Sequence, residues 1–286
     1  MKWKDGTAQK ICLLSLILLM ASAWSHAEVY RFAPLPMQAP EQIAREVLPM
    51  LAYLEAETGL HFELVYSESY EELIHLFAEG DIDLTYLGPL PYVRLKASFP
   101  EAEPLVVFRE PQGNALYTCA LVHFAGDTLP TDETSLAYAL TQPLSTCGFL
   151  ATAALLRERG VDLHQARYCY LGRHDQVALA VVRGEFALGG LKTQIAEQFS
   201  HLGLAVLAET PPLPGFALVA NQQRLTPADR LRLQHALLDL NVEANADLLS
   251  HWGPSLRYGV ELIEDANYAP VRALLQNTPI PEECHR

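Results

Sequence analysis

The chain has 286 residues, of which 50% are hydrophobic and 19% charged, and its 34 acidic and 20 basic side chains give a net charge of −14. This composition is too apolar for a disordered segment, too acidic for a general nucleic-acid binder and too long for a disulfide-stapled miniprotein. The length suits one large domain or two lobes.

The first 27 residues have the pattern of a secretory signal. Three lysines precede a largely apolar stretch over residues 11–21, and small residues follow up to Ala27. This stretch is shorter than the roughly 20 residues that a membrane span requires. We therefore expect a signal peptide over residues 1–27, cleaved after Ala27. Its removal takes away three Lys and one Asp, so the exported protein would carry a net charge of −16.

Four cysteines remain after cleavage: Cys119, Cys147, Cys169 and Cys284. An exported protein reaches a compartment that permits disulfides, and four cysteines allow three full pairings. The sequence does not choose among them. Cys284 lies in a Pro-rich tail, where it could equally be free.

Strand-like runs alternate with helical patterns, which favours an α/β chain with mainly parallel strands. In the first half the predicted strands cover residues 29–33, 62–66, 81–87 and 116–124, and the predicted helices cover residues 41–58, 70–80 and 92–97. Gly59 is expected to end the first helix, and Ser69 with Glu72 forms a capping box at the start of the second.

The second half continues the alternation. Helices are predicted over residues 148–160, 175–184 and 191–200, separated by strands over residues 166–171, 186–189 and 204–208. A Pro-rich break at 211–214 precedes a strand over 216–221, and from Thr226 onward the pattern is helical. No apolar run after the signal is long enough to cross a bilayer.

Two predicted helix starts carry groups that could bind an anion. Ser145, Thr146, Cys147 and Gly148 open an apolar helix, where unpaired backbone N–H groups and partial positive charge favour an oxyanion. An ordinary N-cap is the alternative interpretation. His174 opens a further helix and could donate to the same ligand, or it could be a solvated cap or a packed histidine.

Neutral phenol donors could complete such a site. Tyr70 begins the second helix and Tyr117 lies in a predicted strand, although either could be an ordinary packed aromatic residue. The ten histidines are scattered without metal-ligand spacing, so no metal site and no cofactor is predicted.

Taken in order, these segments resemble the periplasmic phosphate/phosphite/phosphonate-binding proteins of ABC importers. The segments that carry the likeness are Ser69-Tyr70-Glu71-Glu72, Gly80-Asp81-Ile82-Asp83-Leu84, Gly88-Pro89, Ser145-Thr146-Cys147-Gly148, Gly172-Arg173-His174-Asp175, Pro212-Leu213-Pro214-Gly215 and the tail from Tyr258 to Arg272. The likeness covers nearly all of the exported chain.

The resemblance implies a type II periplasmic-binding-protein fold, in which two α/β lobes enclose a ligand cleft and two crossings form the hinge. Lobe 1 would comprise residues 28–115 and 216–286, and lobe 2 residues 116–215. The crossings would lie near residues 113–117 and 214–217. The implied location is the periplasm.

The resemblance also implies which residues hold the ligand oxygens. They are Tyr70, Tyr117, Ser145, Thr146, Cys147 and His174, with Gly148, Tyr92, Lys192 and Gln194 as further possible contacts. Cys147 stands where the family usually has Ser, which replaces a good hydroxyl donor by a weak thiol donor. Lys192 is a second departure, and a solvated helix lysine is the favoured interpretation of it.

Family members that bind an ammonium tail supply carboxylates for it. At the best-matching positions this chain has Gln194 and Phe216 instead. A cationic tail would then lack a countercharge. The expected ligand is therefore phosphite, phosphate or an alkylphosphonate without a cationic tail, captured without enzymatic chemistry by a monomer and passed to an ABC permease. The alternatives are presentation to a membrane sensor kinase, binding of a sulfonate or other anion and, more remotely, a Cys147-dependent hydrolase.

Overall fold

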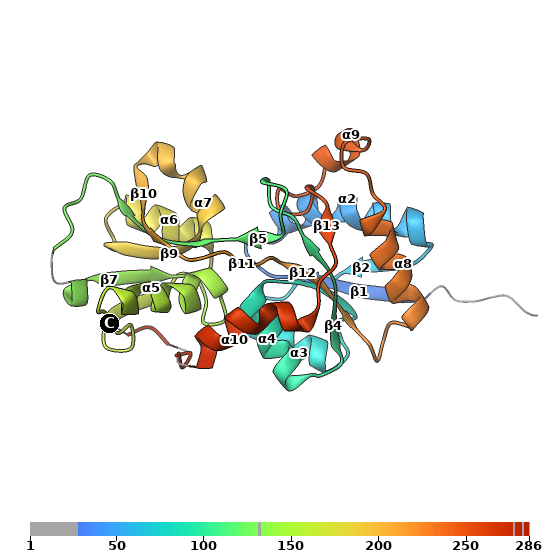
Figure 1. Ribbon diagram of the computed structural model, residues 1–286, viewed down its shortest axis with the longest axis horizontal. Helices are drawn as coiled ribbons and strands as arrows, with labels where there is room; N and C mark the ends of the chain where they lie inside the picture. The colour runs from blue at the N-terminus through green and yellow to red at the C-terminus, as the bar shows by residue number, and fades with distance from the viewer. Residues whose placement is uncertain (1–27, 131–132, 277, 282, 286) are drawn as a thin grey trace, which may run out of the picture.

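The computed structural model describes residues 28–130, 133–276, 278–281 and 283–285, and the predicted signal peptide lies outside these residues. Two α/β lobes lie side by side and are joined by a pair of short strands (Figure 1). We call the six-stranded sheet with its helices lobe 1 and the five-stranded sheet with its helices lobe 2. No helix in the described part of the chain is both long and apolar enough to span a membrane.

Lobe 1 contains a sheet with the strand order β13-β4-β12-β3-β1-β2. In chain order its strands are β1 (Val29–Pro34), β2 (His61–Leu64), β3 (Leu84–Leu87), β4 (Ala102–Phe108), β12 (Ala217–Asn221) and β13 (Val260–Glu261). Its helices are α2 (Pro40–Thr58), α3 (Tyr70–Ala78), α4 (Pro89–Ser98), α8 (Pro227–Leu238), α9 (Ala246–Ser250), the 3-10 turn η4 (Asp265–Tyr268) and α10 (Ala269–Gln276).

Local sequence explains the helices that face the cleft between the lobes. The buried stripe of α2 includes Ile43, Val47, Leu51 and Leu54, and the helix ends at Gly59, whose φ of 69° is the left-handed conformation that glycine adopts readily. Ser69 caps α3 as predicted, since its hydroxyl accepts a bond from the backbone N–H of Glu72 at 3.1 Å. The second bond of the predicted capping box differs, because the Glu72 carboxylate accepts from the backbone N–H of Glu68 and not from that of Ser69.

Lobe 2 contains a sheet with the strand order β10-β6-β9-β7-β8. Its strands are β6 (Cys119–Phe124), β7 (Ala137–Leu140), β8 (Arg167–Tyr170), β9 (Leu188–Lys192) and β10 (Leu204–Glu209). Its helical elements are η1 (Glu133–Ser135), η2 (Thr146–Ala151), α5 (Thr152–Glu158), α6 (His174–Val182), α7 (Thr193–Gln198) and η3 (Ser200–Leu202).

The hinge consists of β5 (Leu116–Tyr117) and β11 (Leu213–Pro214), which pair antiparallel between the two larger sheets (Figure 1). Thr118 separates β5 from β6, so the single strand predicted over residues 116–124 is divided where the chain leaves the hinge. Phe216 follows the returning crossing and stacks on Tyr86 of lobe 1 with ring centroids 5.2 Å apart.

Several sequence predictions need correction. Parallel pairs join β1 to β2 and β3, and β7 to β8 and β9, but the six remaining pairs among the described strands are antiparallel. The expectation of mainly parallel pairing is therefore wrong, because β6 and β12 enter their sheets from the hinge in the opposite direction. The helix predicted from Gly148 begins as a π-helical turn at Thr146, and Lys192 ends β9 instead of lying in a helix.

Two disulfides settle the cysteine pairing that the sequence left open. Cys119 bonds to Cys147, and Cys169 bonds to Cys284. The second bond attaches the C-terminal tail to β8, where His285 also forms a β-bridge with Tyr168. Because α10 lies against α4 of lobe 1, the tail returns from lobe 1 to lobe 2 (Figure 1).

Candidate functional site

A cavity of about 450 Å³ lies between the lobes and beside the hinge. Lobe 1 lines it with the loop after β1 and the starts of α2 and α3, the hinge with Tyr117 and Phe216, and lobe 2 with the starts of η2, α6 and α7. Eight residues predicted as ligand contacts are among its lining: Tyr70, Tyr117, Ser145, Thr146, Cys147, His174, Lys192 and Gln194.

The start of η2 presents hydroxyl and backbone groups to this cavity. The Ser145 hydroxyl accepts a bond from the Gly148 N–H at 2.9 Å, so Ser145 is also an ordinary N-cap. The Thr146 hydroxyl accepts a hydrogen bond from the Leu90 N–H of lobe 1 at 2.9 Å and retains its own proton for donation. The first N–H groups of this helical run have no intrahelical acceptor, so they can bind an anion.

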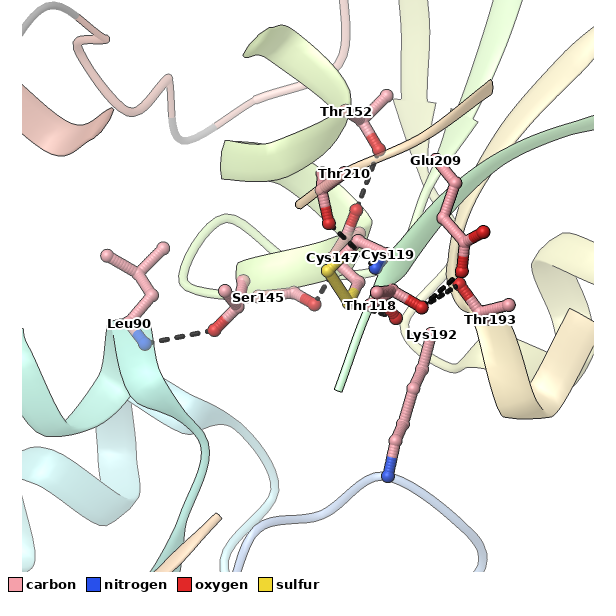
Figure 2. Close-up of a disulfide and its surroundings, with 12 residues drawn as sticks. Leu90, Thr118, Cys119, Ser145, Cys147, Thr152, Lys192, Thr193, Glu209 and Thr210 are labelled. Carbon is pink, nitrogen blue, oxygen red and sulfur yellow. Dashed lines mark hydrogen bonds between the residues drawn. A yellow bond between two sulfur atoms is a disulfide. The ribbon is translucent and has the colours of Figure 1, made fainter. Parts of the chain in front are cut away.

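Cys147 is not the weak thiol donor that the sequence suggested. Its sulfur is bonded to Cys119 at the start of β6, and Figure 2 shows this disulfide tying η2 to the sheet of lobe 2. The carbonyl of Cys147 also accepts a bond from the Thr152 hydroxyl at 2.7 Å. Without a thiol, Cys147 cannot act as a nucleophile, which removes the basis of the hydrolase alternative.

His174 is the first residue of α6 and is buried against the cavity. Burial and, to a smaller extent, the nearby Lys192 ammonium lower the pKa of its imidazole to about 4, and the Asp175 carboxylate opposes part of this shift. The ring is therefore neutral at pH 7 and has one N–H to donate. Its Nδ1 atom is buried with no hydrogen-bond partner among the described residues, which is the state expected of a group awaiting a ligand.

Tyr70 and Tyr117 reach the cavity from lobe 1 and from the hinge. Burial raises the pKa of both phenols, and for Tyr117 the Thr146 hydroxyl opposes part of this rise. Both side chains are therefore neutral at physiological pH and can donate their O–H protons.

Lys192 faces the cavity, so its interpretation as a solvated helix lysine is wrong. Its ammonium lies 2.6 Å from Glu110 Oε1, and both side chains are more than nine-tenths buried. Burial lowers the pKa of Lys192, while the Glu110 carboxylate opposes this by stabilising the charged form. Figure 2 shows the lysine side chain extending away from the Cys119–Cys147 disulfide.

Two possible contacts from the sequence are not among the residues that line the cavity. Tyr92 is fully buried in lobe 1, where its hydroxyl donates to Asp265 Oδ1 at 2.7 Å. Gly148 lies against Thr141, whose Oγ1 atom would be 1.8 Å from a Cβ at this position. A hydrogen bond within lobe 1 therefore accounts for Tyr92, and close packing against Thr141 accounts for the glycine at position 148.

Charged residues that were not predicted as ligand contacts also belong to the site. Arg173 contributes to the lining and pairs with Asp175 through two contacts of 3.1 Å. Glu46 lines the lobe 1 wall and accepts a bond from Gln42 at 2.6 Å. The position of Arg173 and Asp175 next to His174 was a usable signal, whereas Glu46 and Glu110 become relevant only through the tertiary fold.

The described residues contain no cluster of three or more His, Cys, Asp or Glu side chains suited to a metal ion. The neutral donors that converge on the cavity are hydroxyls, backbone N–H groups and an imidazole, and the wall also holds the Lys192 and Arg173 cations, each paired with a carboxylate. Such a set can surround an oxyanion by hydrogen bonds from both lobes, and charge-assisted bonds of this kind are the stronger ones.

The match to known proteins covers most of the chain. Residues 32–268 match the family described as "ABC transporter, phosphonate, periplasmic substrate-binding protein". The phosphate-import protein PhnD of Mycolicibacterium smegmatis is 25% identical over an alignment of 284 residues, and the match covers 90% of this chain and 88% of that protein.

Solved structures share the fold. PhnD1 from Prochlorococcus marinus in complex with methylphosphonate superposes with a TM-score of 0.76 at 16% identity, covering 87% of this chain and 98% of the other. A binding-protein component of an ABC phosphonate transporter from Pseudomonas aeruginosa gives 0.75 at 18% identity, with 87% and 86% covered. The predicted two-lobed type II fold is confirmed, and the chain belongs to the periplasmic substrate-binding protein family of phosphonate ABC transporters.

Proposed function

We propose that the protein captures a small phosphorus oxyanion in the cleft and delivers it to an ABC permease in the inner membrane. The ligand would be phosphite, phosphate or an alkylphosphonate without a cationic tail. Binding would be non-covalent, with the protein acting as a monomer and not as an enzyme. The observation that carries the proposal is the convergence of uncharged donors from both lobes on one cavity, including the unpartnered buried Nδ1 of His174.

In this proposal each lobe supplies part of the donor set. Ser145, Thr146 and the first N–H groups of η2 hold the oxygens in lobe 2, and His174 completes that side. Tyr70 closes from lobe 1 and Tyr117 donates from the hinge. Ligand contacts available only when both lobes engage would stabilise the closed form.

The location and the lobe boundaries form part of the same proposal. The mature protein would be periplasmic after cleavage of residues 1–27. Lobe 1 would comprise residues 28–115 and 216–286, and lobe 2 residues 116–215, except that Cys284 and His285 of the tail lie against β8 of lobe 2. The family match supports import over presentation to a sensor kinase and over sulfonate binding.

A thermal-shift screen tests the ligand class. The mature protein would be heated with phosphite, phosphate, methylphosphonate, sulfate, methanesulfonate and 2-aminoethylphosphonate, since a specific ligand raises the melting temperature by mass action. Calorimetry then gives affinities. A shift with sulfur oxyanions alone, or tighter binding of 2-aminoethylphosphonate than of phosphite, would contradict the proposal.

Substitutions test the site itself. Thr146→Ala and His174→Ala should each weaken binding of the best phosphorus oxyanion by about 10-fold or more. Thr226→Ala is the matched control, because Thr226 caps α8 through the Asp229 N–H at 3.1 Å and does not line the cavity. If both site variants bind as the wild type does, the donor set is wrong.

A further inference from the structure

The cavity wall near the hinge contains a buried ion pair that the proposed donor set does not use. Lys192 ends β9, and Glu110 lies on the segment that leads from β4 into the hinge. The two side chains are 7% and 9% exposed, and their charged atoms are 2.6 Å apart. A buried pair of this kind seldom adds stability beyond that of apolar residues of the same size, so its presence needs another explanation.

The two partners of this pair do not face the same space. Lys192 is one of the residues that line the ligand cavity, whereas Glu110 is not. Glu110 instead lines a second cavity of about 250 Å³, for which Lys192, Tyr117 and Gln194 form the shared wall. A ligand in the cleft would therefore meet the ammonium first, with the carboxylate behind it.

The Lys192 ammonium has N–H donors that its bond to Glu110 does not use. Of its three protons one serves Glu110, and the nitrogen lies 5.3 Å from the ring centre of Tyr117 and 5.4 Å from that of Phe216. Contact with ring faces stabilises a cation, and it holds this one beside the cavity.

The other basic groups of the lining are already neutral or paired. Arg173 makes two contacts with Asp175, and His174 is uncharged at pH 7. Among the described lining residues, Lys192 is therefore the cation whose countercharge lies outside the cavity. On the opposite wall Glu46 is engaged with Gln42.

The cavity has room for more than the tetrahedral head of an oxyanion. Its volume of about 450 Å³ falls in the range of sites that hold whole small molecules, roughly 300–1,000 Å³. A substituent on phosphorus could thus extend along the aromatic floor formed by Tyr117 and Phe216, toward the Lys192 ammonium.

We propose that Lys192 is a specificity-determining residue that selects phosphonates with an anionic substituent, such as a carboxylate, and disfavours those with a cationic one. This inference rests on the proposed function, because it assumes that the phosphorus oxygens occupy the donor set described above. The tail would meet the positive end of the Lys192–Glu110 pair, so the Glu110 carboxylate weakens both the attraction of an anionic tail and the repulsion of a cationic one, but the nearer ammonium sets their sign.

The test uses three phosphonates of similar length with different tails: phosphonoacetate, 2-hydroxyethylphosphonate and 2-aminoethylphosphonate. Calorimetry at pH 7.5 should rank them in that order for the wild type, with about tenfold between neighbours. The double variant Lys192→Met/Glu110→Gln removes both charges without leaving a buried carboxylate unpaired, and it should bring all three affinities within about threefold. The single variant Glu110→Gln should increase the preference for phosphonoacetate.

The control variant Arg183→Met/Glu185→Gln removes an exposed ion pair on lobe 2 and should keep the wild-type order. Unchanged ratios in a folded Lys192→Met/Glu110→Gln protein would overturn the inference. Tighter wild-type binding of the amino than of the hydroxyl compound would also overturn it, and would point to Glu46. Failure of the proposed function looks different, since the wild type would then bind neither the neutral phosphonate nor phosphate.

Discussion

The Thr146 hydroxyl of lobe 2 accepts a hydrogen bond from the Leu90 N–H of lobe 1 at 2.9 Å. Leu90 is in the first turn of α4, whose N-cap Gly88 has no side chain to cap the helix. In the same way the Gln142 side chain of lobe 2 accepts from the Tyr70 N–H at the start of α3, at 3.2 Å. Two helix starts of lobe 1 are thus capped from across the cleft, which links lobe closure to the proposed ligand site.

Thr146→Val should therefore impair both closure and binding, because valine keeps the shape and loses the hydroxyl. We expect phosphate or methylphosphonate affinity to fall about 10- to 100-fold, and Thr146→Ser to retain most of it. Small-angle X-ray scattering should show a more open unliganded protein for Thr146→Val. Gln142→Ala separates the two effects, since Gln142 does not line the ligand cavity. Gln142→Ala should open the unliganded protein but reduce ligand affinity less than Thr146→Val does. Equal losses of affinity in the two variants would contradict a direct role of Thr146 in binding.

The buried imidazole of His174 should make stability depend on pH. Its pKa is about 4 in the folded protein and near 6.5 when unfolded, so the unfolded chain binds more protons between these values. Stability then rises with pH from about 4 to 6.5 and is lost as pH falls through that window, by up to about 3 kcal/mol. Urea unfolding of wild type and His174→Gln at pH 4.5, 5.5 and 7 measures this, and the variant should show a shallower dependence. If the unfolding free energy of the two proteins depends equally on pH, His174 does not contribute to that dependence.

The sequence was sufficient where local signals agree with the fold. The apolar stripe of α2 and the Ser69 cap of α3 needed no tertiary information. By contrast, β4 contains Pro104, which discourages a strand prediction, yet a register shift in its pairing with β12 accommodates this residue. The short β7, with alanine at two of its four positions, has little strand propensity of its own and depends on β8 and β9.

The residues of the site likewise differ in whether local sequence was enough to identify them. Ser145, Thr146 and His174 could be found because helix starts with donor groups are visible in the sequence, and the family resemblance grouped them. Lys192 was misjudged because its burial depends on Glu110, which is 82 positions away. Cys147 was misjudged because a disulfide partner cannot be chosen from spacing alone. Both errors concern pairs that only the folded chain brings together.

The Cys119–Cys147 disulfide should support stability and not ligand chemistry. It closes a loop of 28 positions, for which loop entropy predicts about 3–4 kcal/mol, so Cys119→Ser/Cys147→Ser should unfold at clearly lower urea concentration. Phosphate affinity should stay within about threefold at a temperature where the variant is folded, because the backbone N–H of residue 147 remains. A folded variant with no affinity would show that the bond positions the donors. Cys169→Ser/Cys284→Ser is the control, since this disulfide lies away from the cavity lining.

Gly190 should be needed for the close approach of β9 to η2. A Cβ at this position would lie 1.9 Å from Thr152 Oγ1 and 2.9 Å from the Cys147 carbonyl oxygen, so Gly190→Ala must push the start of η2 away from the sheet. Its backbone is not in the left-handed region, and the effect is therefore steric. We expect a loss of about 1–3 kcal/mol in unfolding free energy and weaker oxyanion binding, because the N–H groups of η2 are displaced. The double variant Gly190→Ala/Thr152→Ala removes the nearest clash and should recover part of both. If urea titration and calorimetry find Gly190→Ala equal to the wild type, close packing at this position does not position the site.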